Sequence, residues 1–323
     1  MNFEVLTPAE IAPEEALHSL QKMRERAKQK WMIIFLTIGL LVLGSSVVYA
    51  LEIKWLLIAY AASCIASVFI VGAWVFLKLP VLTEVEHKYA QVVLPGLFTK
   101  TGATEVRVGK HHDLSMKTFL EAGLYHDKYS SISREDYIQG KFNERPFGMY
   151  EIAIQTVATY GGGGAQNTVG TNRFYGWFII VPADRISGFH FITMRYRNNN
   201  GESDDWHTLT LQHWEEDVHL QKFVPGESKF DDAFLLNTNQ PEALHEILTP
   251  SLQEFLLYAA ATAKNSFAIS IQRSRIYVMI GHERANFRQC PEKKFTEEFH
   301  PDLLEDVKWY ADLLKGIHKV GSR

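Results

Sequence analysis

The sequence predicts an α+β protein in which a two-helix transmembrane hairpin precedes a cytosolic domain of antiparallel sheet with helices packed on it. Three observations predict this class. Two long uncharged runs lie near the N-terminus, the middle third alternates apolar and polar residues between turn signals, and the last third has apolar residues at helical spacing. Because strand-like and helix-like stretches are segregated along the chain, the class is α+β rather than α/β.

Residues 1–30 predict a cytosolic amphipathic helix. Thr7 is followed by Pro8 and then by Glu10, which is the pattern of a capping box with proline at the first helical position. Leu17 and Leu20 provide part of an apolar face on the residues that follow. The helix is therefore expected to continue towards the first apolar run.

Residues 31–51 and 55–77 carry no charged side chain, and residues 52–54 are the whole connection between them. Each run exceeds the ~20 residues that a helix needs to cross a hydrocarbon core. A secretory signal has one shorter apolar region, and a buried core helix of this length normally keeps some polar positions. Residues 31–79 are therefore expected to form a transmembrane helical hairpin.

The flanking charges orient this hairpin. A basic cluster precedes the first run, whereas the connection carries only Lys54 beside Glu52. The positive-inside rule then keeps the N-terminus in the cytoplasm, and two crossings return the rest of the chain to the same side. The basic residues set this topology or contact lipid headgroups; they are Lys22, Arg24, Arg26, Lys28 and Lys30.

The second run has small side chains at four-residue spacing, which allow close approach of helices in lipid. The residues are Ala59, Ser63 and Ser67, with Ala62 and Ala66 beside them. They form either the seam of the hairpin itself or a face for oligomers or a partner span. Apart from Cys64 and tyrosines, the two runs contain no ionisable group, which argues against an ion or proton path.

Composition sets further bounds on function. The net charge of −4 among 323 residues, with a sequence pI of about 6.4, does not indicate nucleic-acid binding. The two cysteines, Cys64 and Cys290, are expected to remain apart, which fits a reducing compartment. Without a visible base partner, Cys290 is expected to be inert rather than a nucleophile.

Residues 80–323 are expected to form the cytosolic domain, as one unit or as two subdomains with a break near residues 225–235. Thr83 and Glu86 have capping-box spacing and predict a juxtamembrane helix. Pro95 and Gly96 are expected to end that helix.

The middle of this domain predicts an antiparallel sheet, because the intervals between strand-like stretches are too short for crossover helices. Residues 174–181 and 188–194 are rich in aromatic and β-branched residues and predict a hairpin around Pro182. The other predicted elements are a short helix capped by Asp113 or Ser115, a strand over 151–159, a flexible loop over 161–167, and weaker strands over 205–212 and 218–224.

The last third combines helices with one further hairpin. Residues 266–271 and 275–280 alternate well on both sides of residues 272–274 and predict two strands joined by a turn. Prolines and apolar spacing predict the helices. In chain order the other elements are a short strand over 234–236 and helices over 241–248, 250–263 and 301–317.

Three spaced blocks in the cytosolic part give the chain a family likeness. They are Ser133-Arg134-Glu135-Asp136-Tyr137-Ile138-Gln139-Gly140, then Glu151 with Phe174-Tyr175-Gly176-Trp177-Phe178, and last Phe230 and Phe234 with Leu244-His245-Glu246-Ile247-Leu248-Thr249-Pro250. With two apolar runs ahead of them, these blocks resemble the bacterial membrane family known as domain of unknown function 3137. This sequence departs from the family at Tyr175, where a basic or polar residue is usual.

The resemblance implies a protein of the bacterial cytoplasmic (inner) membrane with a cytosolic α+β domain. It implies no activity and no catalytic residues, because none is established for the family.

A search for chemistry assigns no catalytic, cofactor-binding or metal-binding residues. The glycine-rich residues 161–168 lack the lysine of a phosphate-binding loop, and neither His245-Glu246 nor His282-Glu283 has the second histidine of a zinc helix. His111-His112-Asp113 has no second ligand cluster. Glu135 and Asp136 lack an evident acid–base partner, and Asp136 is more simply read as completing a capping box with Ser133.

The outward members of the aromatic run Phe174, Tyr175 and Trp177 are candidates for an exposed patch. Together these features favour a non-enzymatic scaffold, assembly or regulatory module at the membrane, with the lipid bilayer and a protein partner or a second copy of the chain as its contacts. The alternative is a membrane-bound hydrolase acting on a lipid-linked or peptide substrate. That alternative requires histidines or carboxylates to converge in a pocket.

Overall fold

The computed structural model describes residues 7–50, 82–110, 114–125, 131–160, 167–197, 203–204, 219–281, 287, 290–291, 294–297 and 299–320. The chain divides into two compact units. The larger unit comprises Leu94–Phe287 and Asp302–Arg323, and the smaller unit comprises Asn2–Val93 and Arg288–Pro301. The division does not fall near residues 225–235, where the sequence suggested a break.

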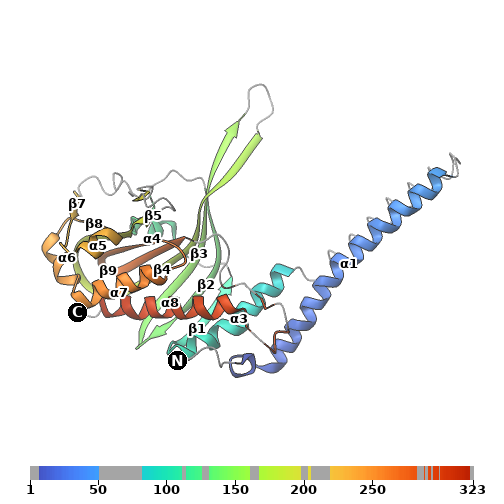
Figure 1. The fold of residues 1–323 in the computed structure, drawn as a ribbon, viewed down its shortest axis with the longest axis horizontal. Coiled ribbons are helices and arrows are strands. Elements are labelled where there is room, and N and C mark those ends of the chain that lie inside the picture. Colours follow the sequence, from blue (N-terminus) through green and yellow to red (C-terminus); the bar gives the residue numbers. More distant parts are fainter. Residues whose placement is uncertain are drawn as a thin grey trace. The chain divides into compact units, whose positions relative to one another are not determined.

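The larger unit is built on a seven-stranded sheet in which every neighbouring pair is antiparallel, as the sequence predicts (Figure 1). The strand order is β1-β2-β3-β4-β8-β7, and β9 also pairs with β4. The strands are β1 (Thr104–Lys110), β2 (Ser131–Phe142), β3 (Arg145–Tyr160), β4 (Asn167–Met194), β7 (Gln221–Phe223), β8 (Phe234–Thr238) and β9 (Phe267–Gly281). A separate two-stranded sheet pairs β5 (Tyr196–Arg197) with β6 (Ser203–Asp204).

The two hairpins predicted over residues 174–194 and 266–280 are wrong. Each is one long strand, β4 with 28 residues and β9 with 15. The two sets of turn-like residues lie opposite each other, because Pro182 pairs with Arg275 and Ile186 with Arg273. Register shifts and the positive φ of Gly188 (+87°) and Arg273 (+55°) mark bulges there. The turn residues therefore bend a continuous ribbon instead of reversing it.

Two other local predictions also fail. The helix α3 (Leu82–Lys100) continues through Pro95, which the sequence suggested as its end. Leu97 and Phe98 after the proline are fully buried, so tertiary packing outweighs the loss of one helical hydrogen bond. Ser133 and Asp136 do not cap a helix, since both lie in β2 beside a bulge.

The remaining helices of the larger unit agree closely with the sequence. In α4 (Met116–Glu121), the Ser115 hydroxyl accepts a hydrogen bond from the Thr118 backbone N at 3.0 Å, as a capping residue should. The helices α6 (Pro241–Ile247), α7 (Pro250–Thr262) and α8 (Pro301–Val320) begin at their predicted prolines. The short α5 (Ser228–Ala233) was not predicted.

One face of the sheet is covered by α4. Phe119 of this helix packs edge-on against Phe178 of β4, with ring centroids 5.2 Å apart, and Tyr277 of β9 stacks on Phe178 at 5.8 Å. Gln272 holds the end of the helix, because its side-chain Nε2 donates to the carbonyl oxygens of Glu121 (2.7 Å) and Ala122 (3.1 Å). A polar residue of the β9 bulge thus provides hydrogen bonds for carbonyl groups that have no partner within the helix.

The opposite face carries α7 and α8, which Figure 1 shows crossing in front of β4 and β9. Trp177 of β4 is 1% exposed, and its ring centroid lies 5.2 Å from that of Phe287. Phe287 in turn lies 5.1 Å from Tyr310 of α8. The two helices meet where the Phe255 ring covers Gly316. Together these residues form an aromatic core between the sheet and α8.

A buried histidine ties β4 to β8. The ring of His190 is 0% exposed, and its Nε2 lies 2.7 Å from the Ser187 carbonyl oxygen, to which it donates. Its Nδ1 lies 2.7 Å from the Thr238 hydroxyl, which donates to the neutral ring and accepts from the Gln240 backbone N at 2.9 Å. Burial lowers the pKa of His190. The neutral ring is therefore the form that matches these partners.

The smaller unit begins with the 3-10 turn η2 (Pro8–Glu10) and the 37-residue helix α1 (Glu14–Ala50). Glu10 Oε2 accepts from the Thr7 backbone N at 2.8 Å, so this half of the predicted capping box is present. Leu17 and Leu20 are buried, and so is Tyr89 of α3. The N-terminal segment is thus helical from Glu14, with part of its apolar face buried.

The first apolar run, up to Ala50, lies in α1. Among the helices that the structure describes, none combines the length and the apolar character that a membrane crossing requires. The second run lies outside the described residues, and so do the small residues assigned to a packing face, Ala59, Ala62, Ser63, Ala66 and Ser67.

We predict that Gly176→Ala destabilises the larger unit, whereas Gly281→Ala does not. The two glycines face each other in the β4–β9 pair. A methyl group at Gly176 would overlap the Ile280 carbonyl oxygen and the Phe174 ring, whereas at Gly281 its nearest neighbour is Phe174 Cε2 at 3.7 Å. Overpacking against backbone should lower the free energy of unfolding by about 1–3 kcal/mol. Denaturant titration of the full chain measures it, and equal effects of the two changes would contradict the packing described.

We also predict that His318 makes the larger unit less stable in acid. Burial, with the positive charge of Arg145 as a second cause, lowers the pKa of His318 from 6.5 to about 4. The unfolded chain therefore binds a proton at a higher pH than the folded chain does. The resulting stabilisation is complete above pH ~6.5 and falls by about 3 kcal/mol as the pH approaches 4.

The matched variants are His318→Gln, which should flatten this part of the pH dependence of unfolding, and His245→Gln at an exposed position of α6, which should not. If His318→Gln keeps the full wild-type slope between pH 7 and 4, the histidine does not enter the folded core as a neutral group.

Candidate functional site

A groove of about 580 Å³ opens in the larger unit where β4 ends beside α5 and the end of α7. Its volume lies in the range of small-molecule sites. Apolar side chains of Met194, Leu257, Ala260 and Ala261 form much of its lining, and charged side chains are also part of the wall. Three other cavities among the described residues are smaller, with volumes of about 140, 370 and 180 Å³.

The β4 side of the groove is fixed by Arg195. Its backbone N donates to the Ala233 carbonyl oxygen at 2.8 Å, and its side-chain Nε donates to the Phe234 carbonyl oxygen at 3.3 Å. These bonds join the end of β4 to the point where α5 passes into β8. The guanidinium group is therefore held at the groove wall by the backbone of the neighbouring element.

Helix α5 contributes Lys229 and Asp232 to the wall. Between them in the sequence lies Phe230, which is fully buried. It anchors this short helix by packing on Phe234, with ring centroids 4.9 Å apart. Lys229 and Asp232 are exposed and lie three residues apart, so they project from neighbouring positions of the helix.

Lys264, just past the end of α7, completes the charged lining. Its Nζ lies 2.9 Å from Asp306, 3.4 Å from Glu305 and 3.7 Å from Asp302 of α8. Burial opposes the charge of Lys264, but the hydrogen bond and the charges of these carboxylates outweigh it and raise its pKa. Burial also raises the pKa of Asp306, against the effect of Lys264. The charge of Lys264 is thus largely balanced by α8.

The positive charges of Arg195 and Lys229, the other two cations of the groove, are not balanced in this way. Among the residues that the structure describes, no carboxylate lies within ion-pair distance of Arg195 or Lys229. Among the described residues that line the groove, Asp232 is the one with a negative charge. The groove therefore combines an apolar lining with two cations whose charge is not neutralised by a direct ion pair.

The aromatic run does not form the exposed patch that the sequence suggested. Trp177 is buried, and Phe174 and Tyr175 are half-buried. Adjacent strand residues point to opposite faces, so Phe174 and Tyr175 are separated by the sheet. The Tyr175 hydroxyl donates to Glu151 Oε1 at 2.6 Å, and Glu151 is completely buried on the α8 side.

Two members of the predicted basic cluster turn inward in the smaller unit, because Arg24 and Lys30 are only 6% exposed. Arg24 Nη1 donates to the Pro291 carbonyl oxygen at 2.7 Å, and its guanidinium lies 4.2 Å above the Phe295 ring. Lys22, Arg26 and Lys28 remain exposed.

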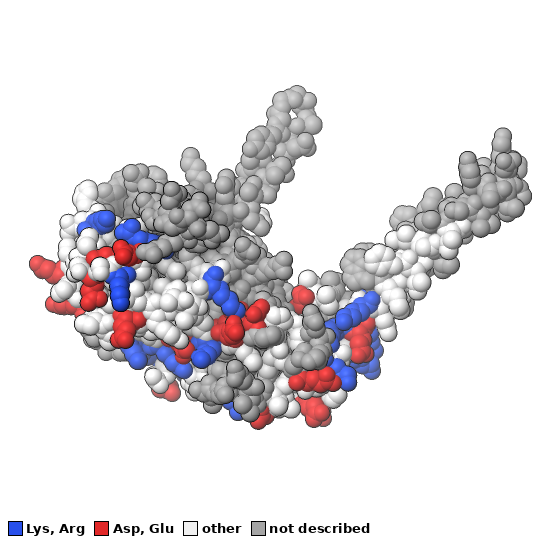
Figure 2. Space-filling model, in the orientation of Figure 1, with Lys and Arg blue, Asp and Glu red and all other residues white. Residues whose placement is uncertain are grey.

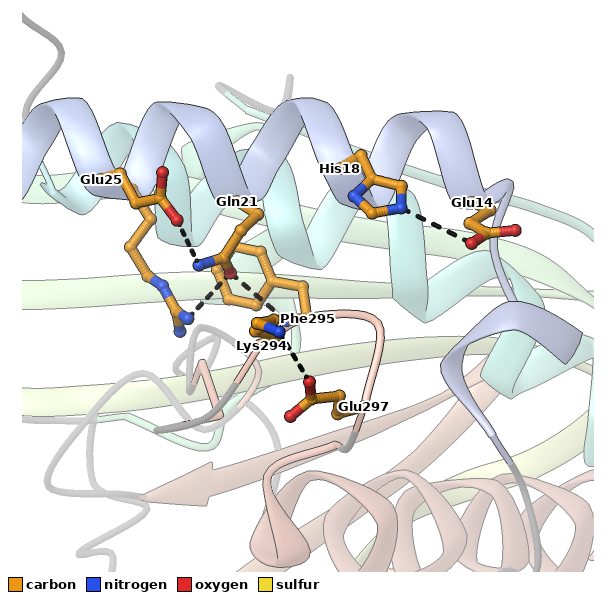
Figure 3. A network of polar contacts seen from close by, with 8 residues as sticks. Glu14, His18, Gln21, Glu25, Lys294, Phe295 and Glu297 are labelled. Carbon is orange, nitrogen blue, oxygen red and sulfur yellow. Dashed lines mark hydrogen bonds and ion pairs between the residues drawn. The ribbon is translucent and has the colours of Figure 1, made fainter.

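Gln21 organises the network around Arg24. Its Oε1 accepts from Arg24 Nη2 at 2.8 Å and from the Phe295 backbone N at 3.4 Å, and its Nε2 donates to Glu25 at 3.1 Å (Figure 3). Arg24 therefore holds the segment around Phe295 against α1, a role that a count of basic residues cannot reveal.

Most of the other residues considered for chemistry lie outside the part of the chain that the structure describes. His245 and Glu246 are exposed on α6, whereas His111, His112, Asp113, His282 and Glu283 lie outside the described residues. Burial, with the charge of Glu86 as a second cause, raises the pKa of the Cys290 thiol to about 12, which leaves it a poor nucleophile. No cluster of three metal-ligating side chains occurs among the residues described.

Sequence reasoning did not find the groove. Arg195, Lys229 and Lys264 come from three elements and share no motif, so only the β4–β8 pairing and the α7 packing bring them together. The charged pair Lys229 and Asp232 would have been a local signal only if a helix had been predicted there, and α5 was not predicted.

Comparisons with known proteins give one family. No curated protein matches the sequence. Among solved structures, the crystal structure of the mycobacterial trehalose monomycolate transport factor A, TtfA, aligns at 7% identity with a TM-score of 0.34, over 73% of this chain and 95% of that chain. Similarity at this level does not establish a shared fold.

The family match covers a large part of the larger unit and also the segment Arg288–Pro301 of the smaller unit. It includes the aromatic block that starts at Phe174 and the block that ends at Pro250, whereas the block at residues 133–140 precedes it. The resemblance inferred from the sequence is therefore confirmed over residues 171–318, which match the model of the family described as "Protein of unknown function (DUF3137)".

Proposed function

We propose that this protein is a non-enzymatic module anchored in a bacterial cytoplasmic membrane, whose larger unit acts on the cytoplasmic side as a scaffold, assembly or regulatory surface. The observation that carries the proposal is the apolar surface of α1. Met32, Phe35, Leu36, Ile38 and Leu43 are 52–67% exposed on this helix.

The distribution of charge along α1 supports the anchor. In Figure 2 the charged side chains of this helix gather in its N-terminal part, and the described surface beyond them is uncharged. The sequence has no charged residue between Lys30 and Glu52. Leaving a large apolar side chain exposed to water costs about 1.5–3 kcal/mol relative to burying it. Such a surface is therefore expected to be buried against a lipid or protein partner.

A bilayer is the covering that accounts for the neighbouring basic residues as well. Lys22, Arg26 and Lys28 are exposed on the turns that precede the apolar surface. This places cations next to the boundary at which anionic headgroups would lie. A protein partner covering α1 would account for the apolar residues but not for the basic ones beside them.

The proposal predicts that α1 contacts acyl chains near Phe35. In a background without reactive thiols (Cys64→Ser, Cys290→Ser), Phe35→Cys labelled with an environment-sensitive fluorophore should be quenched by lipids that carry a quencher on the acyl chain. The full chain is reconstituted for this purpose into vesicles of phosphatidylethanolamine and phosphatidylglycerol.

The matched control is Val224→Cys, which labels an equally exposed apolar position of the larger unit (60% exposed). We expect strong quenching and a blue-shifted emission at position 35 and neither at position 224. Equal quenching at both positions, or a blue shift at position 35 that the lipid quencher leaves unchanged, would contradict a bilayer anchor.

A further inference from the structure

We propose that the groove between the end of β4, α5 and the end of α7 binds an anionic amphiphile, a molecule with one carboxylate or phosphate head and an acyl-like body. The inference goes beyond membrane anchoring and does not depend on it. It rests on the combination of charged and apolar side chains in the lining of a single cavity of about 580 Å³.

The head of the ligand is assigned to Arg195 and Lys229. Both line the groove, and neither is paired with a carboxylate of the described residues. The Nε of Arg195 is already committed to the Phe234 carbonyl oxygen, which orients the guanidinium without neutralising it. A preoriented guanidinium that lines the same groove as an ammonium group is suited to a carboxylate or phosphate oxygen.

Lys264 has a different part. Its ammonium group is fixed on the groove wall by Asp302, Glu305 and Asp306, and these contacts satisfy its charge. Lys264 therefore shapes one side of the groove instead of attracting the head. Asp232, on the same wall as Lys229, would repel a second negative charge and so favours a ligand with a single anionic head.

The body of the ligand is assigned to the small apolar side chains of α7. Ala260 and Ala261 of α7 line the groove with small side chains, and Leu257 and Met194 add larger apolar ones. Small side chains along one helix flank allow an extended apolar chain to lie against the backbone. An inorganic anion would bind the cations but leave the apolar lining exposed to water. Charged and apolar lining in one groove therefore favours an amphiphile.

Photo-crosslinking tests the assignment in the full chain, reconstituted in phosphatidylcholine nanodiscs. The probes are laurate carrying a diazirine on its acyl chain and the matching uncharged lauryl alcohol. A third probe, phosphatidylglycerol with the same diazirine, distinguishes a membrane lipid from a free fatty acid as the source of the head. Mass spectrometry locates the labelled peptides.

We expect the laurate probe to label residues 257–266 and Met194, with competition by unlabelled laurate but not by acetate. Arg195→Gln/Lys229→Gln should reduce this labelling at least tenfold, because two charged contacts are lost. The matched double variant Lys222→Gln/Lys308→Gln removes the same net charge at exposed positions outside the groove and should leave labelling unchanged.

A second variant tests the body of the ligand separately. Ala261→Trp fills the groove at an exposed position and retains both cations, so it should also abolish labelling while the chain stays folded. Labelling by the alcohol as strong as by laurate, competition by acetate, or labelling unaffected by Arg195→Gln/Lys229→Gln would each overturn the proposal.

Discussion

The larger unit depends on one constraint, which is that β4 pairs with three other strands. Its N-terminal half pairs with β3, its C-terminal end pairs with β8, and β9 accompanies it from Gly176 to Thr193. The side chains of β4 therefore supply both faces of the sheet, with Phe178 beneath α4 and Trp177 beneath α8. Because β4 also ends at the groove, any shift of its register would displace Arg195 together with the core.

Buried polar groups make that register specific. Gln272 meets the end of α4, His190 is bonded to Ser187 and Thr238, and Glu151 accepts from Tyr175. Each of these side chains would lose its partner if β4 or β9 moved by one residue, and an unsatisfied buried polar group costs about 1–3 kcal/mol. The apolar residues favour a sheet covered on both faces, and the polar ones determine which residues pair in it.

Much of the fold could be predicted from the sequence, because helix caps and prolines act locally. Ser115 and the prolines at positions 241, 250 and 301 gave helix starts that the structure confirms. Turns were predicted around Pro182 and Arg273, where the structure has bulges. Turns and bulges favour the same residue types, and only pairing with a neighbouring strand distinguishes them. The groove could not be predicted, since its cations come from elements that meet only through long-range pairing. Likewise, burial of Arg24 against Phe295 depends on a segment more than 250 residues away.

The two units carry separate parts of the proposed function, an apolar helix for attachment and a sheet that holds a charged groove. The role of β4 as the central strand can be tested most directly by amide hydrogen exchange resolved along the full chain. The account predicts that residues 176–181 and 190–193 of β4, with 276–280 of β9, exchange more slowly than β1 at the sheet edge and open together. Exchange of residues 176–181 as fast as that of β1, or independent opening of β4 and β9, would contradict it.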